Sequence, residues 1–81
     1  METLSLKQLK EKTLGYINGD INAMDISQWA ANIHLRYEKR ELDFVDCERK
    51  RMLEFIFDLI DLNDKRFADS KDVLEKKLKE L

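Results

Sequence analysis

The fold is decided by an apolar stretch near the middle of the second half, MLEFIFDLIDL at residues 52–62. Its apolar residues recur every three or four positions, which is the spacing of one helix face. Met52 and Ile56 lie on the strongest face, and Phe55 and Phe57 widen the apolar surface around more than half of the helix. Because such a helix must be covered on most sides, we expect it to lie at the centre of a bundle.

Cap signals on either side of this stretch predict three further helices. Ser5 and Gln8 have the spacing of a capping box, and Asn22 can cap a second helix. Gly19 is a stop signal between them, because glycine adopts the left-handed conformation at little cost. Asp43 is the expected N-cap of the central helix, and Asp69 or Ser70 that of the last one. We therefore predict an all-α fold, a small four-helix bundle forming a single domain over residues 1–81, with helices over 5–18, 23–38, 43–62 and 70–80.

The predicted core combines helix faces with two apolar residues in connections. Ile21 and Phe67 are the expected loop anchors, and Trp29 is the expected largest single contributor. The predicted core consists of Leu6, Leu9, Ile17, Ile21, Ile26, Trp29, Ile33, Met52, Leu53, Ile56, Leu59, Ile60, Phe67, Leu74 and Leu78.

Length and composition exclude several classes of protein. The chain has 81 residues, no proline, 40% charged residues and a net charge of −2, a combination that disfavours an all-β sandwich. Its longest apolar runs have three residues, whereas a membrane-spanning helix needs about 20. No secretory signal is visible, and a single cysteine cannot form a disulfide framework. We expect a cytoplasmic protein without a membrane-bound partner.

Residue types that carry chemistry are few. One histidine, His34, and one cysteine, Cys47, are present, whereas a structural zinc site needs four such ligands. We interpret Cys47 as a packing residue and His34 as a boundary residue. The sequence therefore predicts neither an enzyme nor a cofactor nor a metal site.

Acidic residues gather where a helix disfavours them. Asp58 and Asp61 lie in the last turns of the central helix and Asp64 just beyond it, although the negative end of a helix dipole disfavours anions. Asp20 and Asp69 add to the same field if the connections lie at one end of the bundle. We therefore predict that these five aspartates form an acidic partner-binding surface that attracts a cationic protein.

A family resemblance suggests what that partner is. The stretch LGYINGDINAMDISQWA at residues 14–30 resembles the opening of small helical immunity proteins of colicin-D-type and contact-dependent growth inhibition toxins. Residues 53–78, with LIDL at 59–62 and an aromatic at Phe67, are similar to the second half of that group. The resemblance implies a bundle that binds a cognate bacterial toxin, often a nuclease with a basic active site, and inhibits it one to one. The chain departs from the group in lacking a tryptophan in its last helix and in its long charged segment at 38–48.

Two other functions remain as alternatives. A helical adaptor could self-associate through Phe55 and Phe57, as a monomer in equilibrium with a weak homodimer. A small nucleic-acid-binding regulator could use the basic residues Arg36, Lys39, Arg40, Arg49, Lys50 and Arg51. Six acidic residues are interleaved with these bases over residues 36–54, so a solvated face without direct nucleic-acid contact is the preferred interpretation.

Overall fold

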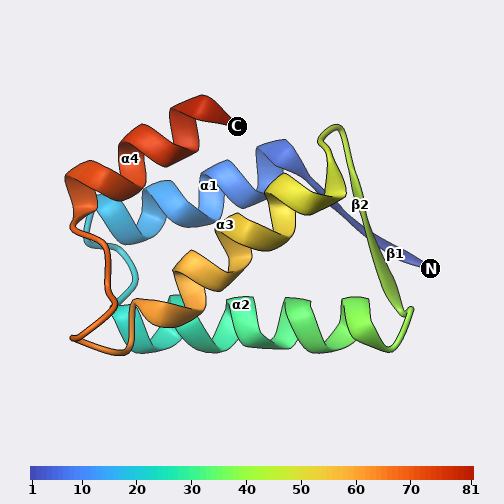
Figure 1. Ribbon diagram of the computed structural model, residues 1–81, viewed down its shortest axis with the longest axis horizontal. Helices are drawn as coiled ribbons and strands as arrows, with labels where there is room; N and C mark the ends of the chain where they lie inside the picture. The colour runs from blue at the N-terminus through green and yellow to red at the C-terminus, as the bar shows by residue number, and fades with distance from the viewer.

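The computed structural model describes all 81 residues and contains four helices and two strands (Figure 1). In chain order the elements are β1 (Glu2–Ser5), α1 (Leu6–Ile17), α2 (Ala23–Glu38), β2 (Leu42–Val45), α3 (Arg49–Asp61) and α4 (Lys71–Glu80). The prediction of an all-α fold is therefore wrong. The chain is a small mixed α/β fold in which β1 and β2 pair as a two-stranded parallel sheet.

The sheet replaces the start of the helix that was expected at 43–62. Leu42 and Phe44 are both buried, and the register places Phe44 opposite Leu4, so one face of the sheet carries all three apolar side chains. A helix over the same residues would separate Leu42 from Phe44, whereas alternation in a strand keeps them on one face. Asp43, the expected N-cap, lies in β2, and α3 begins only at Arg49.

The other cap predictions are confirmed. Ser5 accepts a hydrogen bond from the Gln8 amide while the Gln8 side chain accepts one from the Ser5 amide, which completes the capping box. Asn22 caps α2 by accepting from the Asp25 amide, and Ser70 caps α4 in the same way. Gly19 adopts a φ of +86° in the connection between α1 and α2, where other residues would be strained.

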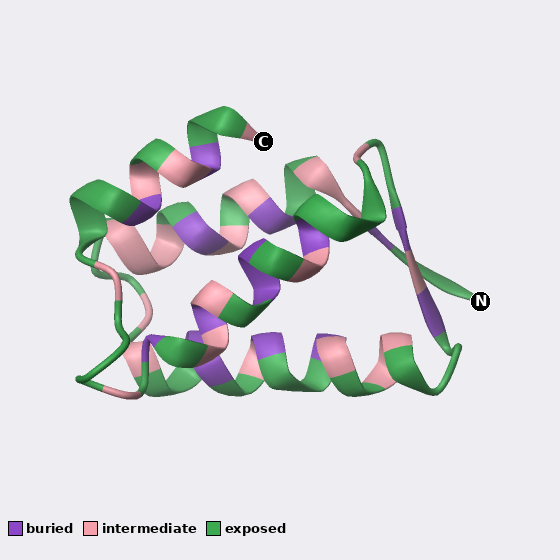
Figure 2. Ribbon diagram, viewed as in Figure 1, coloured by how far each residue is buried: buried purple, intermediate pink, exposed green.

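The core forms around α3, as expected from its wide apolar surface. Met52, Phe55, Ile56 and Leu59 are buried, and α2 packs along α3 (Figure 2). The Ser27 hydroxyl donates to the Ile60 carbonyl at 2.7 Å, which ties these two helices together at one end. The fourth helix, α4, packs mainly against α1.

Of the predicted core residues one, Phe67, is exposed, and six are only partly buried: Leu6, Ile17, Ile21, Trp29, Leu53 and Ile60. Phe67, an expected loop anchor, is 65% exposed, because its connection turns tightly through a hydrogen bond from the Phe67 amide to the Asp64 carbonyl. Trp29 is only partly buried and packs at the edge of the core, with the Lys12 ammonium over its ring. The strand residues Leu4, Leu42 and Phe44 supply buried surface that was not predicted.

The elements give the molecule two different ends. The connections between α1 and α2 and between α3 and α4 lie at one end, and the sheet lies at the other (Figure 1). No helix has both the length and the apolar character needed to cross a membrane.

Candidate functional site

The candidate site is the end of the molecule that holds the two helix connections, which we call the loop end and define as residues 14–25 and 58–73. It comprises the last turn of α1, the first turn of α2, the end of α3 and the start of α4, joined by the two connections. The acidic surface was predicted on the condition that the connections lie at one end. The connections that carry Asp20 and Asp69 do lie at the same end as the C-terminus of α3 (Figure 1).

The loop end is the acidic part of the chain. It contains seven acidic and three basic residues and thus carries a net charge of −4, whereas the remainder has ten acidic and twelve basic residues and a net charge of +2. Lys77 reaches toward this end from α4, and counting it leaves −3. The charge of the molecule is therefore polarised along its length.

Lys77 joins two of the five predicted site residues. Its ammonium donates to Asp69 at 2.7 Å and to Asp58 at 3.2 Å, so these two carboxylates from different elements meet at one cation. Burial raises the pKa of Asp58 even though the hydrogen bond from Lys77 opposes this shift. The hydrogen bond to Asp69 raises the pKa of Lys77. This trio links α3, α4 and their connection, and two of the predicted acids thereby serve the fold.

The other three aspartates differ in how far they are engaged. Asp64 is paired with Arg66 two residues later, and hydrogen bonds from the Arg66 side chain and amide lower its pKa. Asp20 and Asp61 are exposed and take part in none of the ion pairs of the chain. Of the five predicted aspartates, these two are left free to meet a cationic partner.

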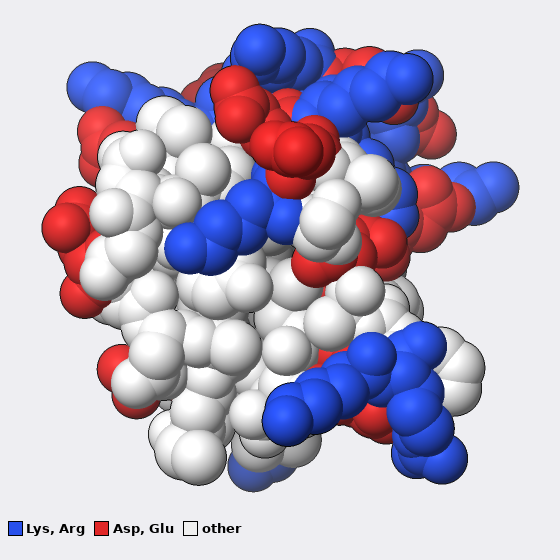
Figure 3. Space-filling model, turned by 90° about the vertical axis from the view of Figure 1, so that its left-hand side faces the viewer, with Lys and Arg blue, Asp and Glu red and all other residues white.

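Exposed apolar side chains gather at the same end. Leu14, Met24, Phe67 and Val73 are between 43% and 65% exposed, and they account for four of the eight large apolar side chains exposed in the chain. Figure 3 shows this end face on: uncharged residues cover much of it, one basic side chain lies across them, and acidic and further basic groups lie around them. An exposed apolar area with a charged rim is the usual composition of a protein-binding surface.

Sequence reasoning missed this apolar component. Phe67 was assigned to the core because an isolated aromatic in a polar connection usually anchors it. The run Asn63-Asp64-Lys65-Arg66 is the signal that could have placed Phe67 at the surface. Asp64 favours a local turn, and such a turn can direct Phe67, the residue after this run, toward solvent.

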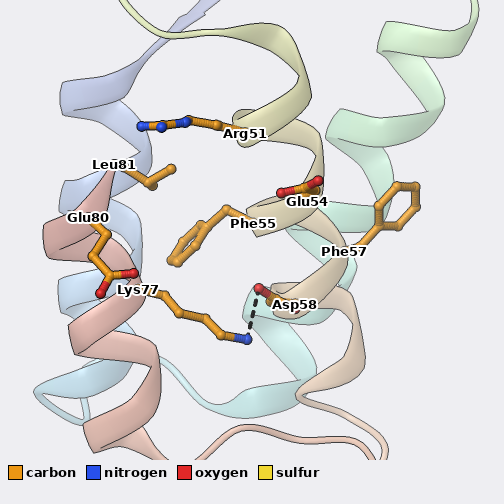
Figure 4. A pocket seen from close by; sticks show the side chains of 8 residues that line it. All are labelled: Arg51, Glu54, Phe55, Phe57, Asp58, Lys77, Glu80 and Leu81. Atoms are coloured by element: carbon orange, nitrogen blue, oxygen red, sulfur yellow. Dashed lines mark hydrogen bonds and ion pairs between the residues drawn. The ribbon is translucent and has the colours of Figure 1, made fainter.

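A groove of about 570 Å³ runs between α3 and α4 (Figure 4). Phe55 and Leu81 supply apolar lining, Glu54 and Glu80 line the same groove, and the Lys77–Asp58 ion pair crosses it. Phe57 also lines this groove, and its ring, on the side of α3 that faces α2, meets that of His34 at a centroid distance of 4.8 Å. Since Phe55 is buried and Phe57 is half-exposed, the Phe55–Phe57 surface predicted for self-association is reduced to Phe57.

The remaining residues singled out from the sequence have local partners. His34 lies 3.3 Å from Glu38 on the same helix, and Cys47 packs half-buried against the core. No group of three or more His, Cys, Asp or Glu side chains is arranged to hold a metal ion. Among the basic residues, Arg36 pairs with Glu2 and Arg49 with Asp43, so part of the basic run is neutralised within the fold.

Comparisons with protein-family models, with curated proteins and with solved structures found no match to this chain.

Proposed function

We propose that this protein binds and inhibits a bacterial toxin, with the loop end as its docking surface. The observation that carries the proposal is the convergence, at one end, of four exposed apolar side chains and a net charge of −4. A partner that fits this surface has an apolar patch bordered by lysine and arginine. The active sites of nucleases have such a basic border, because they bind phosphates.

The contacts within the loop end separate the aspartates that stabilise the fold from those that can bind a partner. Asp58 and Asp69 are held by Lys77, so their charge is largely used inside the protein. Asp20 and Asp61 are free, and they would attract a cationic partner to the loop end and form ion pairs with it. Phe67 is the most exposed aromatic side chain at this end, and large aromatic residues contribute most of the binding energy in many interfaces.

The resemblance noted in the sequence supports a toxin as the partner, since immunity proteins of that group inhibit their toxins by stoichiometric binding. An inhibitor of a toxin that attacks nucleic acid inside the cell would act in the cytoplasm. The single free cysteine, Cys47, fits that reducing compartment.

The test is a pull-down of the tagged protein from its native cells, followed by an inhibition assay with the basic toxin domain that we expect to recover at a one-to-one ratio. We expect activity to fall linearly to zero at one equivalent of inhibitor. Phe67→Ala should weaken binding by more than about fivefold, because a hot-spot truncation costs over about 1 kcal/mol. Asp61→Lys should lower the association rate and flatten its dependence on salt, because that rate is set by long-range charge.

Glu41→Lys is the matched control, because it makes the same charge change at an exposed position beside the sheet. Equal effects of Asp61→Lys and Glu41→Lys would show that net charge, and not the loop end, governs association. A toxin whose activity is unaffected by excess protein would overturn the proposed function.

A further inference from the structure

The two outer edges of the sheet are not equivalent. On β2 the outward Phe44 amide donates to the Asp43 carboxylate at 2.8 Å, and Arg49 holds that carboxylate at 3.0 and 2.6 Å. The outward donor of β2 at Phe44 is thereby occupied and covered by an ion pair. Charged side chains over an edge are a common protection against pairing with further strands.

The outer edge of β1 is open at its centre. The Glu2 amide donates to the Glu41 carbonyl at 3.1 Å, so Glu2 faces β2. Because successive residues of a strand direct their backbone groups to opposite sides, the N–H and C=O of Thr3 face away from β2. Further along this edge, the Ser5 amide is already taken by the Gln8 side chain. Thr3 therefore presents one free donor and one free acceptor.

This edge opens into a groove of about 480 Å³ bounded by α1 and α2. Leu4, Trp29 and Ile33 give the groove apolar lining, and no residue of α3 or α4 contributes to it. Because α1 and α2 both contribute lining residues, a partner must reach β1 between these helices, which favours an extended segment over a whole domain. The charged lining residues are Glu2, Glu11, Lys12 and Arg36, which balance to zero.

We propose that this groove binds an extended segment of a partner protein, which adds to β1 as a third strand. An antiparallel segment can exchange both hydrogen bonds of Thr3 with one of its residues, and its alternate side chains can rest on Leu4 and Trp29. The balanced charge of the groove matches a segment without net charge. In this it differs from the cationic partner proposed for the loop end, and the two surfaces are independent.

The test uses a displayed library of random 12-residue peptides selected on the full chain. Trp29 is the only tryptophan and lines the groove, so its fluorescence reports binding directly. We expect selected peptides to be uncharged overall and to change this fluorescence saturably. Thr3→Pro removes the outward donor and leaves the bonds to β2 in place, and it should weaken binding about 3- to 10-fold. Thr3→Val keeps the donor and should bind like the unchanged protein.

Asn32→Phe provides a second test from α2, since it adds bulk to the groove without changing any residue of β1 and should also weaken binding. Peptides that bind Thr3→Pro and Asn32→Phe as well as the unchanged protein would overturn the proposal, as would a library that yields no binder. A fluorescence change that follows protein concentration without peptide would identify a second copy as the occupant and would equally refute it.

Discussion

The ion pairs of Lys77 allow a sharp test of what holds α4 in place. Lys77→Met keeps most of the apolar stem and removes the charge that lies between Asp58 and Asp69. The three side chains are 23–39% exposed, so the expected loss lies between that of a surface pair and that of a buried one, at about 1–2 kcal/mol at pH 7. For a domain of this size, such a loss lowers Tm by about 4–16 °C.

The pH dependence of the free energy of unfolding distinguishes the loss of the Lys77 charge from the loss of packing of its side chain. Burial raises the pKa of Asp58, so the folded state holds its proton more tightly than the unfolded state does. Protonation of Asp58 in acid removes one of the two charges that Lys77→Met leaves unpaired, and the deficit of Lys77→Met should therefore shrink between pH 7 and pH 3. In the unchanged protein the raised pKa of Lys77 contributes stability that is complete below the ordinary lysine pKa and is lost as the pH rises through the raised value.

The assay is urea unfolding followed by circular dichroism at both pH values, with Lys79→Met as the matched control. Lys79 lies on the same helix and pairs only with Glu75, and its side chain is 77% exposed, so its loss should change stability by less than about 0.5 kcal/mol. An equal deficit of Lys77→Met at pH 7 and pH 3 would refute the reasoning, because the loss would then come from packing of the stem.

Three further predictions concern other parts of the chain. Asp61→Lys places a cation at the C-terminus of α3 and should stabilise the protein by about 0.5–1 kcal/mol, which thermal unfolding would detect as a higher Tm; an unchanged Tm would contradict the helix-dipole argument. Gly19→Ala should destabilise it by about 1 kcal/mol in urea unfolding, since the φ of +86° disfavours a side chain, and an equal or higher midpoint would show that the turn adapts. The ion pair with Arg49 holds the pKa of Asp43 below its ordinary value. The stabilising effect of this pair is therefore present at neutral pH and is lost as the pH falls through the lowered pKa. The urea midpoints of Asp43→Asn and of the unchanged protein should differ at pH 7 and converge near pH 2.

Local signals in the sequence were sufficient for the helices but not for the sheet. The caps at Ser5, Asn22 and Ser70 depend on residues three positions apart, and the structure confirms all three. The strands have four residues each and pair across forty residues of chain, so no local pattern indicates that they meet. Their one visible signal is the alternation Leu42-Asp43-Phe44, which is too short to distinguish a strand from the start of a helix.

The sequence indicated the acidic residues of the candidate site but not its apolar part. Whether the five aspartates lie at one end depended on the positions of the connections, which the sequence left open. Which of them remain free could not be predicted, because Lys77 lies eight residues from Asp69 and nineteen from Asp58 and reaches them only through the packing of α4. The exposure of Phe67 likewise depends on how its connection turns after Asp64.

The pairing of β1 with β2 also sets the order in which the protein folds. Closing a loop of forty residues costs about 1 kcal/mol more chain entropy than closing the ten-residue connection between α2 and α3. We therefore expect the α2–α3 pair to form early and the sheet to form late, as contact order implies. During synthesis β1 leaves the ribosome about forty residues before its partner strand, so it remains without its native neighbour for longer than α2 remains without α3.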